Sequence, residues 1–371
     1  MLCTLKIKLV PNTEQFNALL ETMKRFNQAC NQVSQTAFET KTFGQIALHK
    51  LCYYDIRKTL GLSAQMAVRT TGKVSESYRT DRKTLHTFKE TGAMVFDSRI
   101  LSFKNMETAS ILTLQGRIRV PMVVSQYHEG LLCGRRVRGQ ADLILQKGVF
   151  YLLLVVDVPE GKPNSDNGFI GVDLGIVNIA VDSTGEVFSG ATVNGLRKRH
   201  IKLRKKLQAK GTKSAKKLLR KRSKKEKLFA RDVNHCISKK LVEKAKGTRS
   251  GIALENLKGI RDRVTVRKAQ RTQHSSWSFY QLRQFVEYKS AIVGVPIVLI
   301  DPRNTSRECP TCGHIDKKNR LTRNAFCCRV CGCAGLADNI AAVNIGRRAN
   351  VNLPNVGVVK TTYKPLALAM G

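Results

Sequence analysis

Four cysteines in the C-terminal third form two Cys-x-x-Cys pairs, Cys309 with Cys312 and Cys328 with Cys331. Fifteen residues separate the two pairs, and a glycine follows each of them. This spacing is typical of a structural zinc site, in which four thiolates surround one ion. The sequence therefore predicts one structural Zn²⁺ in a small zinc ribbon.

Three acidic residues, Asp173, Glu255 and Asp338, occupy comparable positions in the sequence. Asp173 and Glu255 each end an apolar strand, and Asp338 opens a helix seven residues after Cys331. If the first and fourth strands of one sheet lie side by side, the two strand ends meet there. A helix packed across the sheet then brings Asp338 to the same point. Clustered carboxylates repel each other unless a divalent cation neutralises them.

Oxygen ligands of this kind favour Mg²⁺ or Mn²⁺. Two such ions about 4 Å apart can activate a water and stabilise the leaving oxygen of a phosphodiester. Each acid taken singly would equally fit a turn or a helix cap. Together, in a strongly basic chain, the three acids predict a nuclease site that binds two metal ions.

The charge of the chain indicates its partner. The 371 residues include 65 Lys and Arg against 27 Asp and Glu, which gives a formal net charge of +38. A protein this basic repels itself unless it binds a polyanion, and the usual polyanion is nucleic acid. A cationic membrane-surface protein is disfavoured because no long helix combines this charge with a strong apolar face.

The most basic stretch runs from residue 197 to residue 231, where Glu226 is the single acid. Its leucines recur at helical spacing and Gly211 separates two expected helices, within a basic helical insertion at residues 195–245. Such a pair of helices is often only a solvated face, but this density of cations favours contact with phosphates. The candidate contacts are Arg197, Lys198, Arg199, Lys202, Lys205 and Lys206.

The N-terminal part predicts a small antiparallel β-barrel that a helical block interrupts. The barrel is expected from residues 1–12, which alternate like a strand, and from residues 95–160, which form short strands separated by turns. Residues 13–94 show helical spacing instead. Residues 159–167 have the composition of a linker.

The C-terminal part predicts a sheet domain with the zinc ribbon inserted into it. The sheet domain is expected at residues 167–302 and 334–350, and the ribbon at residues 303–333. Residues 261–274 are basic and polar, which fits a mobile loop. Residues 351–371 lack acids and periodicity, which fits a loose tail.

The remaining cysteines and the apolar runs bear on location. The first ten residues alternate like a strand and show no apolar segment of a signal peptide. The longest apolar runs are too short to cross a bilayer. We therefore expect reduced thiols, a cytoplasmic location and no membrane association. The cysteines outside the ribbon are scattered singly: Cys3, Cys30, Cys52, Cys133 and Cys236.

Five segments resemble the signature motifs of the transposon-encoded TnpB proteins, the compact relatives of the Cas12 effectors. They occur in the family's order and cover most of residues 167–348. The helical block within a barrel resembles the family's recognition and wedge domains more loosely. The segments are Gly171-Val-Asp173-Leu-Gly-Ile-Val-Asn178, Ala253-Leu-Glu255-Asn-Leu-Lys, Asp301-Pro-Arg-Asn-Thr305-Ser-Arg-Glu-Cys309-Pro-Thr-Cys312-Gly, Phe326-Cys-Cys328-Arg-Val-Cys331-Gly and Ala337-Asp338-Asn-Ile-Ala-Ala-Val-Asn344-Ile.

This resemblance implies an RNase H-like, RuvC-like nuclease domain whose catalytic triad is Asp173, Glu255 and Asp338. It implies zinc at the four ribbon cysteines. It also implies two partners, a guide RNA transcribed from the protein's own transposon and double-stranded target DNA. Such a protein is expected to cut both strands in one site beside a short motif, while base pairing reads the target. A monomer with one RNA is expected, and a dimer stays open.

Some positions depart from the family's pattern. Arg307 stands where the family commonly has Gln, and Ile340 stands where it often has Asn. Cys327 and Cys333 are extra thiols, which leave an exchange of zinc ligands open. None of these changes removes an acid of the triad.

The residues that read the adjacent motif are the least defined. The family uses its barrel and helical block for this task. The candidate neighbourhood here runs from Ser63-Ala-Gln65 through Lys73 and Tyr78. An ordinary helix surface is an equally good interpretation.

Three other functions can be compared with the sequence. A strand-transfer transposase with a His-x-His motif is disfavoured because the seven histidines include no such pair. A nuclease-inactive RNA-guided repressor would lack an acid of the triad, and all three are present. A Cas12-type effector would share the chemistry and differ in the source of its guide, which the genomic neighbourhood decides.

Overall fold

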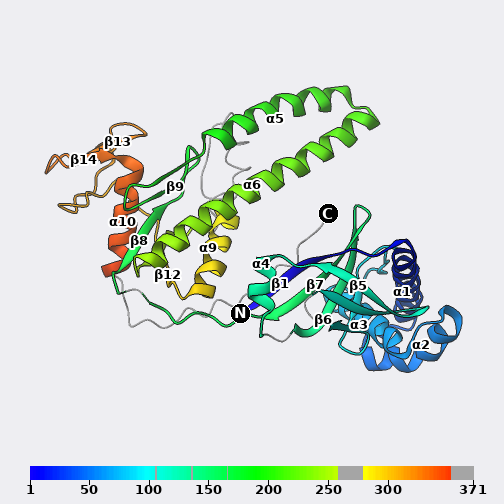
Figure 1. The fold of residues 1–371 in the computed structure, drawn as a ribbon. Helices are drawn as coiled ribbons and strands as arrows, with labels where there is room; N and C mark the ends of the chain where they lie inside the picture. Colours follow the sequence, from blue (N-terminus) through cyan, green and yellow to red (C-terminus); the bar gives the residue numbers. More distant parts are fainter. Residues whose placement is uncertain (105–106, 135–136, 165, 258–278, 352–371) are drawn as a thin grey trace. The chain divides into compact units, whose positions relative to one another are not determined.

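The computed structural model describes residues 1–104, 107–134, 137–164, 166–257 and 279–351, whose helices and strands Figure 1 labels. The chain divides into two compact units, the first ending at Val158 and the second beginning at Pro159. The loop expected at residues 261–274 and residues 352–371 of the expected tail lie outside the described residues.

The first unit contains a seven-stranded antiparallel sheet in the order β2-β6-β7-β1-β5-β4-β3, which forms a nearly closed barrel. β1 lies at its centre and pairs with β7 on one side and β5 on the other. The N-terminal strand therefore joins the barrel, as the sequence predicted. The strands are Leu2–Leu9 (β1), Met94–Phe96 (β2), Leu101–Lys104 (β3), Thr108–Thr113 (β4), Gly116–Val123 (β5), Val137–Gln146 (β6) and Val149–Asp157 (β7).

Three helices interrupt the barrel between β1 and β2, where the sequence predicted a helical block. α1 begins at a capping box in which the Asn12 side chain accepts a hydrogen bond from the Gln15 backbone N–H at 2.8 Å. α2 ends at Gly61, whose φ of 65° is left-handed. A short helix, α4 (Gln126–Leu132), was not expected from the sequence. The three inserted helices are Thr13–Glu39 (α1), Gln45–Leu60 (α2) and Ala64–Thr80 (α3).

The second unit is built on a five-stranded sheet in the order β10-β9-β8-β11-β12. β8 pairs antiparallel with β9 and parallel with β11, and β11 runs parallel to β12. The first and fourth strands of this unit therefore lie side by side, which is the arrangement that a shared carboxylate site requires. The strands are Phe169–Asp173 (β8), Asn178–Asp182 (β9), Val187–Ser189 (β10), Gly251–Glu255 (β11) and Ile297–Ile300 (β12).

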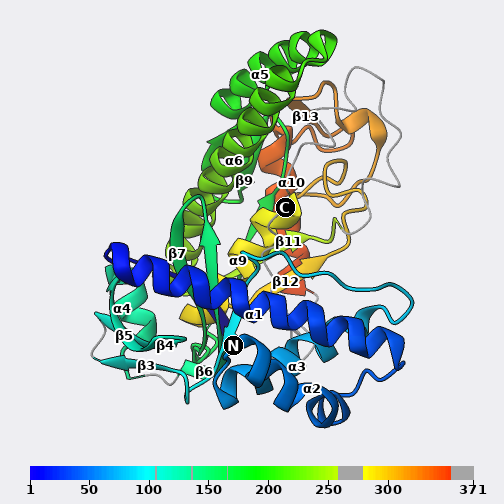
Figure 2. The same ribbon diagram turned by 90° about the vertical axis from the view of Figure 1, so that its right-hand side faces the viewer.

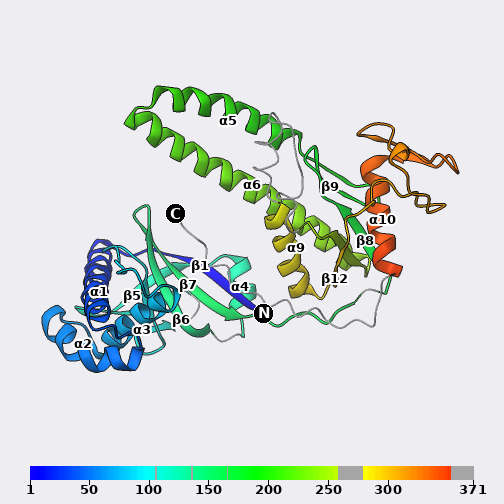
Figure 3. The same cartoon turned by 180° about the vertical axis from the view of Figure 1, so that it is seen from behind.

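Helices cover both faces of the five-stranded sheet (Figure 3). α6 (Lys213–Gly247) and α9 (Phe279–Val293) pack on one face, and α10 (Ala337–Val351) packs on the other, beside β8. Because side chains alternate along a strand, each strand contributes to both layers. The core of the unit therefore lies between the sheet and these three helices.

The same alternation decides which face carries the acids. Val172 of β8 packs with α6 and α9, so the next residue, Asp173, belongs to the face that α10 covers. Ala253 of β11 packs with α10, so Glu255, two residues later, belongs to that face as well. Both carboxylates therefore point to the side from which α10 supplies Asp338.

α5 (Ala191–Lys210) and α6 form a long antiparallel hairpin, shown from a second side in Figure 2. Gly211 joins them with a left-handed φ of 63°, at the break that the sequence predicted. The C-terminal part of α6 is fixed to the sheet because Lys244 forms an ion pair of 2.5 Å with the buried Asp182.

The ribbon lies between β12 and α10, as the sequence predicted. Its strands β13 (Ala325–Cys327) and β14 (Ala334–Leu336) pair antiparallel, and a short 3₁₀ helix, η1 (Lys317–Asn319), precedes them. The expected linker is not a free connection. The Gly161 backbone N–H donates a hydrogen bond to the Ala291 carbonyl of α9 at 2.9 Å.

Candidate functional site

Asp173 and Glu255 end neighbouring parallel strands. The residues before them, Val172 and Leu254, are direct partners in the pairing of β8 with β11. In a parallel pair the two strands end at the same edge of the sheet, so both carboxylates leave it there. The structure thus places these two acids together on the face that α10 covers.

Asp338 reaches this edge from the first turn of α10. The side-chain amide of Asn178, at the start of β9, donates a hydrogen bond to Asp338 Oδ2 at 3.0 Å. The guanidinium nitrogen Nη2 of Arg320, in the ribbon, lies 3.9 Å from Asp338 Oδ1. The three acids therefore converge although they come from distant parts of the chain.

The three carboxylates act on one another electrostatically. Burial, and then the charges of Glu255 and Asp338, raise the pKa of Asp173 to about 7, while the positive charge of Arg320 opposes the shift. Repulsion of this kind is what three acids in one site produce, and divalent cations relieve it. The oxygen donors therefore fit Mg²⁺ or Mn²⁺.

Glu255 is buried, and burial raises the pKa of its carboxyl group. The Thr305 hydroxyl donates a hydrogen bond to Glu255 Oε1 at 2.6 Å, which favours the charged form. Thr305 is fixed in turn by α10, because the Asn344 side-chain amide donates to its carbonyl oxygen at 2.8 Å. Thr305, at the start of the ribbon, therefore connects Glu255 to α10, the helix that carries Asp338.

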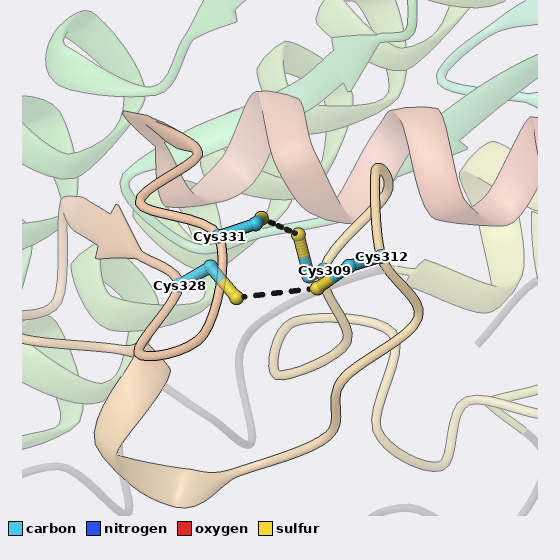
Figure 4. A group of neighbouring side chains, drawn as sticks. All are labelled: Cys309, Cys312, Cys328 and Cys331. Atoms are coloured by element: carbon cyan, nitrogen blue, oxygen red, sulfur yellow. Dashed lines mark hydrogen bonds between the residues drawn. The ribbon is translucent and has the colours of Figure 1, made fainter.

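The four ribbon cysteines lie together, with all ligand sulfurs within 4.8 Å of one another (Figure 4). The Sγ atoms of Cys309 and Cys331 are 3.4 Å apart, and those of Cys312 and Cys328 are 3.5 Å apart. Tetrahedral Zn–S bonds of about 2.3 Å place sulfurs somewhat under 4 Å apart, so the set fits zinc. In the described part of the chain, no other group of three or more His, Cys, Asp or Glu residues is gathered this closely, and this includes the group of Asp173, Glu255 and Asp338.

The turns of the two knuckles have the geometry that such a site needs. Gly313 and Gly332 adopt left-handed φ values of 73° and 70°. Their backbone N–H groups donate to the carbonyl oxygens of Cys309 and Cys328, at 3.0 and 3.1 Å. The glycine after each cysteine pair is therefore explained by the turn that returns the chain to the metal site.

A buried asparagine connects the two knuckles to Arg320. Asn319 is fully buried; its side-chain amide donates to the carbonyl oxygens of Arg307 and His314 at 3.0 and 3.1 Å. Its side-chain oxygen accepts from the Arg329 backbone N–H at 3.0 Å. Arg320 is the next residue, so the fold of the ribbon sets where its guanidinium lies.

The basic hairpin presents most of its candidate phosphate contacts to solvent. Five of the six are exposed along α5: Lys198, Arg199, Lys202, Lys205 and Lys206. Arg197 differs, because its side chain is buried, which leaves it outside this exposed row. The single acid of the stretch, Glu226, accepts hydrogen bonds from His200 and Arg204, both at 3.2 Å, and so ties α6 to α5.

The neighbourhood expected to read an adjacent motif is largely committed to the fold. Tyr78 is fully buried, and its hydroxyl donates a hydrogen bond to the Ser34 carbonyl oxygen. The Lys73 ammonium group donates a hydrogen bond to Asn27 Oδ1 at 2.9 Å. Gln65 donates to the carboxylate of Asp97. A reading surface that includes Lys73 and Tyr78 is therefore not supported, because these side chains are engaged inside the first unit.

Within the described part of the chain, no helix combines the length and the apolar character that crossing a membrane requires.

Sequence reasoning assigned no role to three residues that contact the acids: Asn178, Thr305 and Arg320. Asn178 and Thr305 stand inside the motifs that resemble the family, which was a usable signal. Arg320 had none, because one arginine among 65 basic residues is not distinctive until the ribbon folds.

Two family models match the chain. The first, described as "Cas12f1-like, TNB domain", matches residues 279–345. The second, described as "Probable transposase", matches residues 153–260. Together they include the strands that carry Asp173 and Glu255, the ribbon, and Asp338.

Two curated relatives match parts of the chain. The CRISPR-associated endodeoxyribonuclease Cas12f1 of Sulfoacidibacillus thermotolerans is 36% identical over 129 residues, which is 34% of this chain and 28% of the relative. The TnpB-like protein MJ0751 of Methanocaldococcus jannaschii is 30% identical over 171 residues, which is 45% of this chain and 60% of the relative. The chain therefore spans less than two thirds of the length of these relatives.

A solved structure shows the same fold over nearly the whole chain. It is a Cas12f1-sgRNA-target DNA complex, with a TM-score of 0.59 and 13% identity, and it covers 93% of this chain and 98% of that chain. The likeness shows a shared multidomain α+β fold.

Proposed function

We propose that this chain, which is related to the TnpB and Cas12f proteins, is an RNA-guided DNA endonuclease encoded by an insertion sequence. It cleaves double-stranded DNA beside a short motif by metal-dependent hydrolysis in a single RuvC-like site. The observation that carries this proposal is the convergence of Asp173, Glu255 and Asp338 at one edge of the five-stranded sheet.

The roles of the acids follow from their surroundings. Asp173, Glu255 and Asp338 are the proposed ligands of two Mg²⁺ or Mn²⁺ ions, which when bound supply a Lewis acid and an activated water. Asn178 orients Asp338, and Thr305 orients Glu255. Burial and the neighbouring charges raise the pKa of Asp173 to about 7, so it must release a proton near neutral pH before it can act as a ligand.

The strand order supports the assignment of an RNase H-like, RuvC-like nuclease domain at residues 167–302 and 334–350. In this domain, three antiparallel strands are followed by two parallel ones, and α10 carries the last acid. The ribbon at residues 303–333 has a structural role, with one Zn²⁺ holding the two knuckles together. The barrel and its inserted helices correspond to the wedge and recognition domains.

Guide RNA and target DNA are the proposed partners. The net charge of +38 needs a polyanion, and the exposed row on α5 offers cations for phosphates. The related solved structure is a complex with sgRNA and target DNA, which supports the same two partners here. One RNA per protein chain is expected.

The guide source can be tested by purifying the full chain after expression together with its flanking DNA and sequencing the RNA that remains bound. A guide that maps to the end of its own insertion sequence supports the proposal. RNA from a repeat array would instead assign the chain to the Cas12-type effectors that its relatives include. Cleavage that needs no RNA would contradict the proposal.

A further inference from the structure

Helix α2 of the first unit exposes a face on which aromatic and cationic side chains alternate. It is anchored by one narrow stripe of buried residues at every fourth position, from Leu48 to Leu60. Side chains four residues apart lie above one another on a helix, so the other positions form rows as well. Two neighbouring rows make up this face: His49, Tyr53 and Arg57, and then Ile46, Lys50, Tyr54 and Lys58.

The first row is braced by contacts among its own members. The rings of His49 and Tyr53 stack with centroids 4.4 Å apart. Arg57 lies over the Tyr53 ring at 5.3 Å and donates a hydrogen bond to its hydroxyl oxygen at 3.2 Å. The ring of Tyr54 meets Tyr53 edge-on at 5.2 Å. The surface beneath Tyr54 is therefore already ordered before any partner binds.

The second row is open to solvent. Tyr54 is 80% exposed, and Ile46, two turns before it, is 77% exposed. Lys50 and Lys58 stand one turn on either side of Tyr54, about 6 Å away along the helix axis. Among the residues that the structure describes, neither lysine has a hydrogen bond or an ion pair. The single acid of α2, Asp55, lies outside both rows, and its carboxylate accepts a hydrogen bond from the side-chain amide of Gln32 in α1.

We propose that this face of α2 binds unpaired nucleotides of the guide RNA. A base stacks on Tyr54, and Lys50 and Lys58 contact the phosphates on either side of it. Aromatic rings between cations are how proteins bind single strands, because every base offers a stacking face. Duplex DNA keeps its bases stacked inside the helix, so unpaired RNA is the better fit.

The charge of the face argues against a second copy of the chain as its partner. A symmetric dimer through α2 would set Lys50, Arg57 and Lys58 against the same residues of the other copy. Like charges in such a contact are unfavourable, whereas phosphates complement them. The proposal rests on the proposed function in that a guide RNA must exist.

The test compares full-length variants for binding of two fluorescent probes, a short poly(U) RNA and the RNA recovered from the complex. Tyr54→Ala is expected to weaken binding of both probes about 5-fold or more, as loss of one base–aromatic stack does. Tyr54→Trp keeps a stacking ring and is expected to restore binding. Leu51→Ala is the matched control, because Leu51 is 54% exposed on the same helix but outside both rows.

Each result has a defined meaning. Unchanged RNA binding by Tyr54→Ala, with cleavage by the wild type intact, would overturn this inference alone. If Tyr54→Ala changes the oligomeric state measured by sedimentation but not RNA binding, the face binds a second copy of the chain, and this inference is also overturned. A wild-type protein that binds neither RNA would contradict the proposed function as well. Thermal unfolding of each variant verifies that the fold is unchanged.

Discussion

Gly171 of β8 and Gly346 of α10 lie in direct backbone contact. A Cβ atom added to Gly171 would lie 2.3 Å from the Gly346 nitrogen and 2.0 Å from the Ala342 carbonyl oxygen. A Cβ atom essentially never lies this close to a heavy atom to which it is not bonded, so α10 can approach β8 this closely only because Gly171 has no side chain. This contact sets the position of the helix that carries Asp338 against the strand that carries Asp173.

Gly171→Ala is therefore expected to force α10 away from the sheet. Overpacking at a buried contact costs about 1–3 kcal/mol in the free energy of unfolding, and displacement of Asp338 should lower the cleavage rate further. Urea unfolding and a cleavage assay measure the two effects. Gly195→Ala on α5 is the control, since nothing lies within 4 Å of the added carbon. It should be stabilising or neutral and leave cleavage unchanged.

The pH dependence of the metal-free protein should report on Asp173. Its pKa is raised from 3.8 to about 7 in the fold, so the folded protein keeps a proton that the unfolded chain releases. The contribution of this group to the free energy of unfolding is constant below about pH 4, falls as pH rises toward 7 and levels off above it, with a slope of at most about 1.4 kcal/mol per pH unit. Thermal unfolding from about pH 5 to 8 measures this fall.

Asp173→Asn removes the titrating group, so the decline attributable to it should disappear and the variant should be the more stable protein at pH 8. Mg²⁺ is expected to stabilise the wild type more than the variant at that pH. An equal decline in both proteins would show that another group is responsible.

Much of this architecture could be predicted because it depends on local patterns. Alternation placed Leu2–Leu9 in the barrel, and Gly211 marked the break between the basic helices. The spacing of the two Cys-x-x-Cys pairs predicted that their four sulfurs lie together. The meeting of Asp173 with Glu255 followed from strand order, once β8 and β11 were taken as neighbours.

The rest depended on contacts between distant segments, which no local pattern encodes. Arg197 looked like its basic neighbours, but the packing of the hairpin buries it. Tyr78 looked like a surface residue of α3, but its hydroxyl bonds to Ser34 across 44 positions of sequence. Arg320 acquires its place only when Asn319 joins the two knuckles.

Loss of a zinc ligand should affect the nuclease site at a distance. Cys328→Ser is expected to abolish tight binding of one zinc per chain, measured by metal analysis, because a closed structural site needs four ligands. Cleavage should then fall, since the ribbon segment also carries Thr305 and Arg320. Cys327→Ser is the matched control and should keep its zinc and its activity. Full zinc content in Cys328→Ser would indicate that a neighbouring thiol had replaced the ligand.

A substitution of Arg320 can test the contact between the ribbon and the acids without removing a zinc ligand. Arg320→Ala removes the cation that opposes the raised pKa of Asp173, so that pKa should rise further. The variant should retain zinc and need less Mg²⁺ for half-maximal cleavage, because the site becomes more negative and a divalent ion gains more from this than a proton does. Arg323→Ala, in the same ribbon segment, is the control and should behave like the wild type. Identical Mg²⁺ dependence for both variants would exclude a role for Arg320 at the site.

In the proposed mechanism, the three acids form a single metal-dependent site for cutting DNA. The direct measurement incubates plasmid DNA carrying a matched target with the purified RNA complex, in Mg²⁺ or in EDTA, for the wild type and for Asp173→Asn. Linear DNA is expected only for the wild type in Mg²⁺, and the variant should still bind the target. Cleavage of either strand by Asp173→Asn at the wild-type rate would contradict this mechanism.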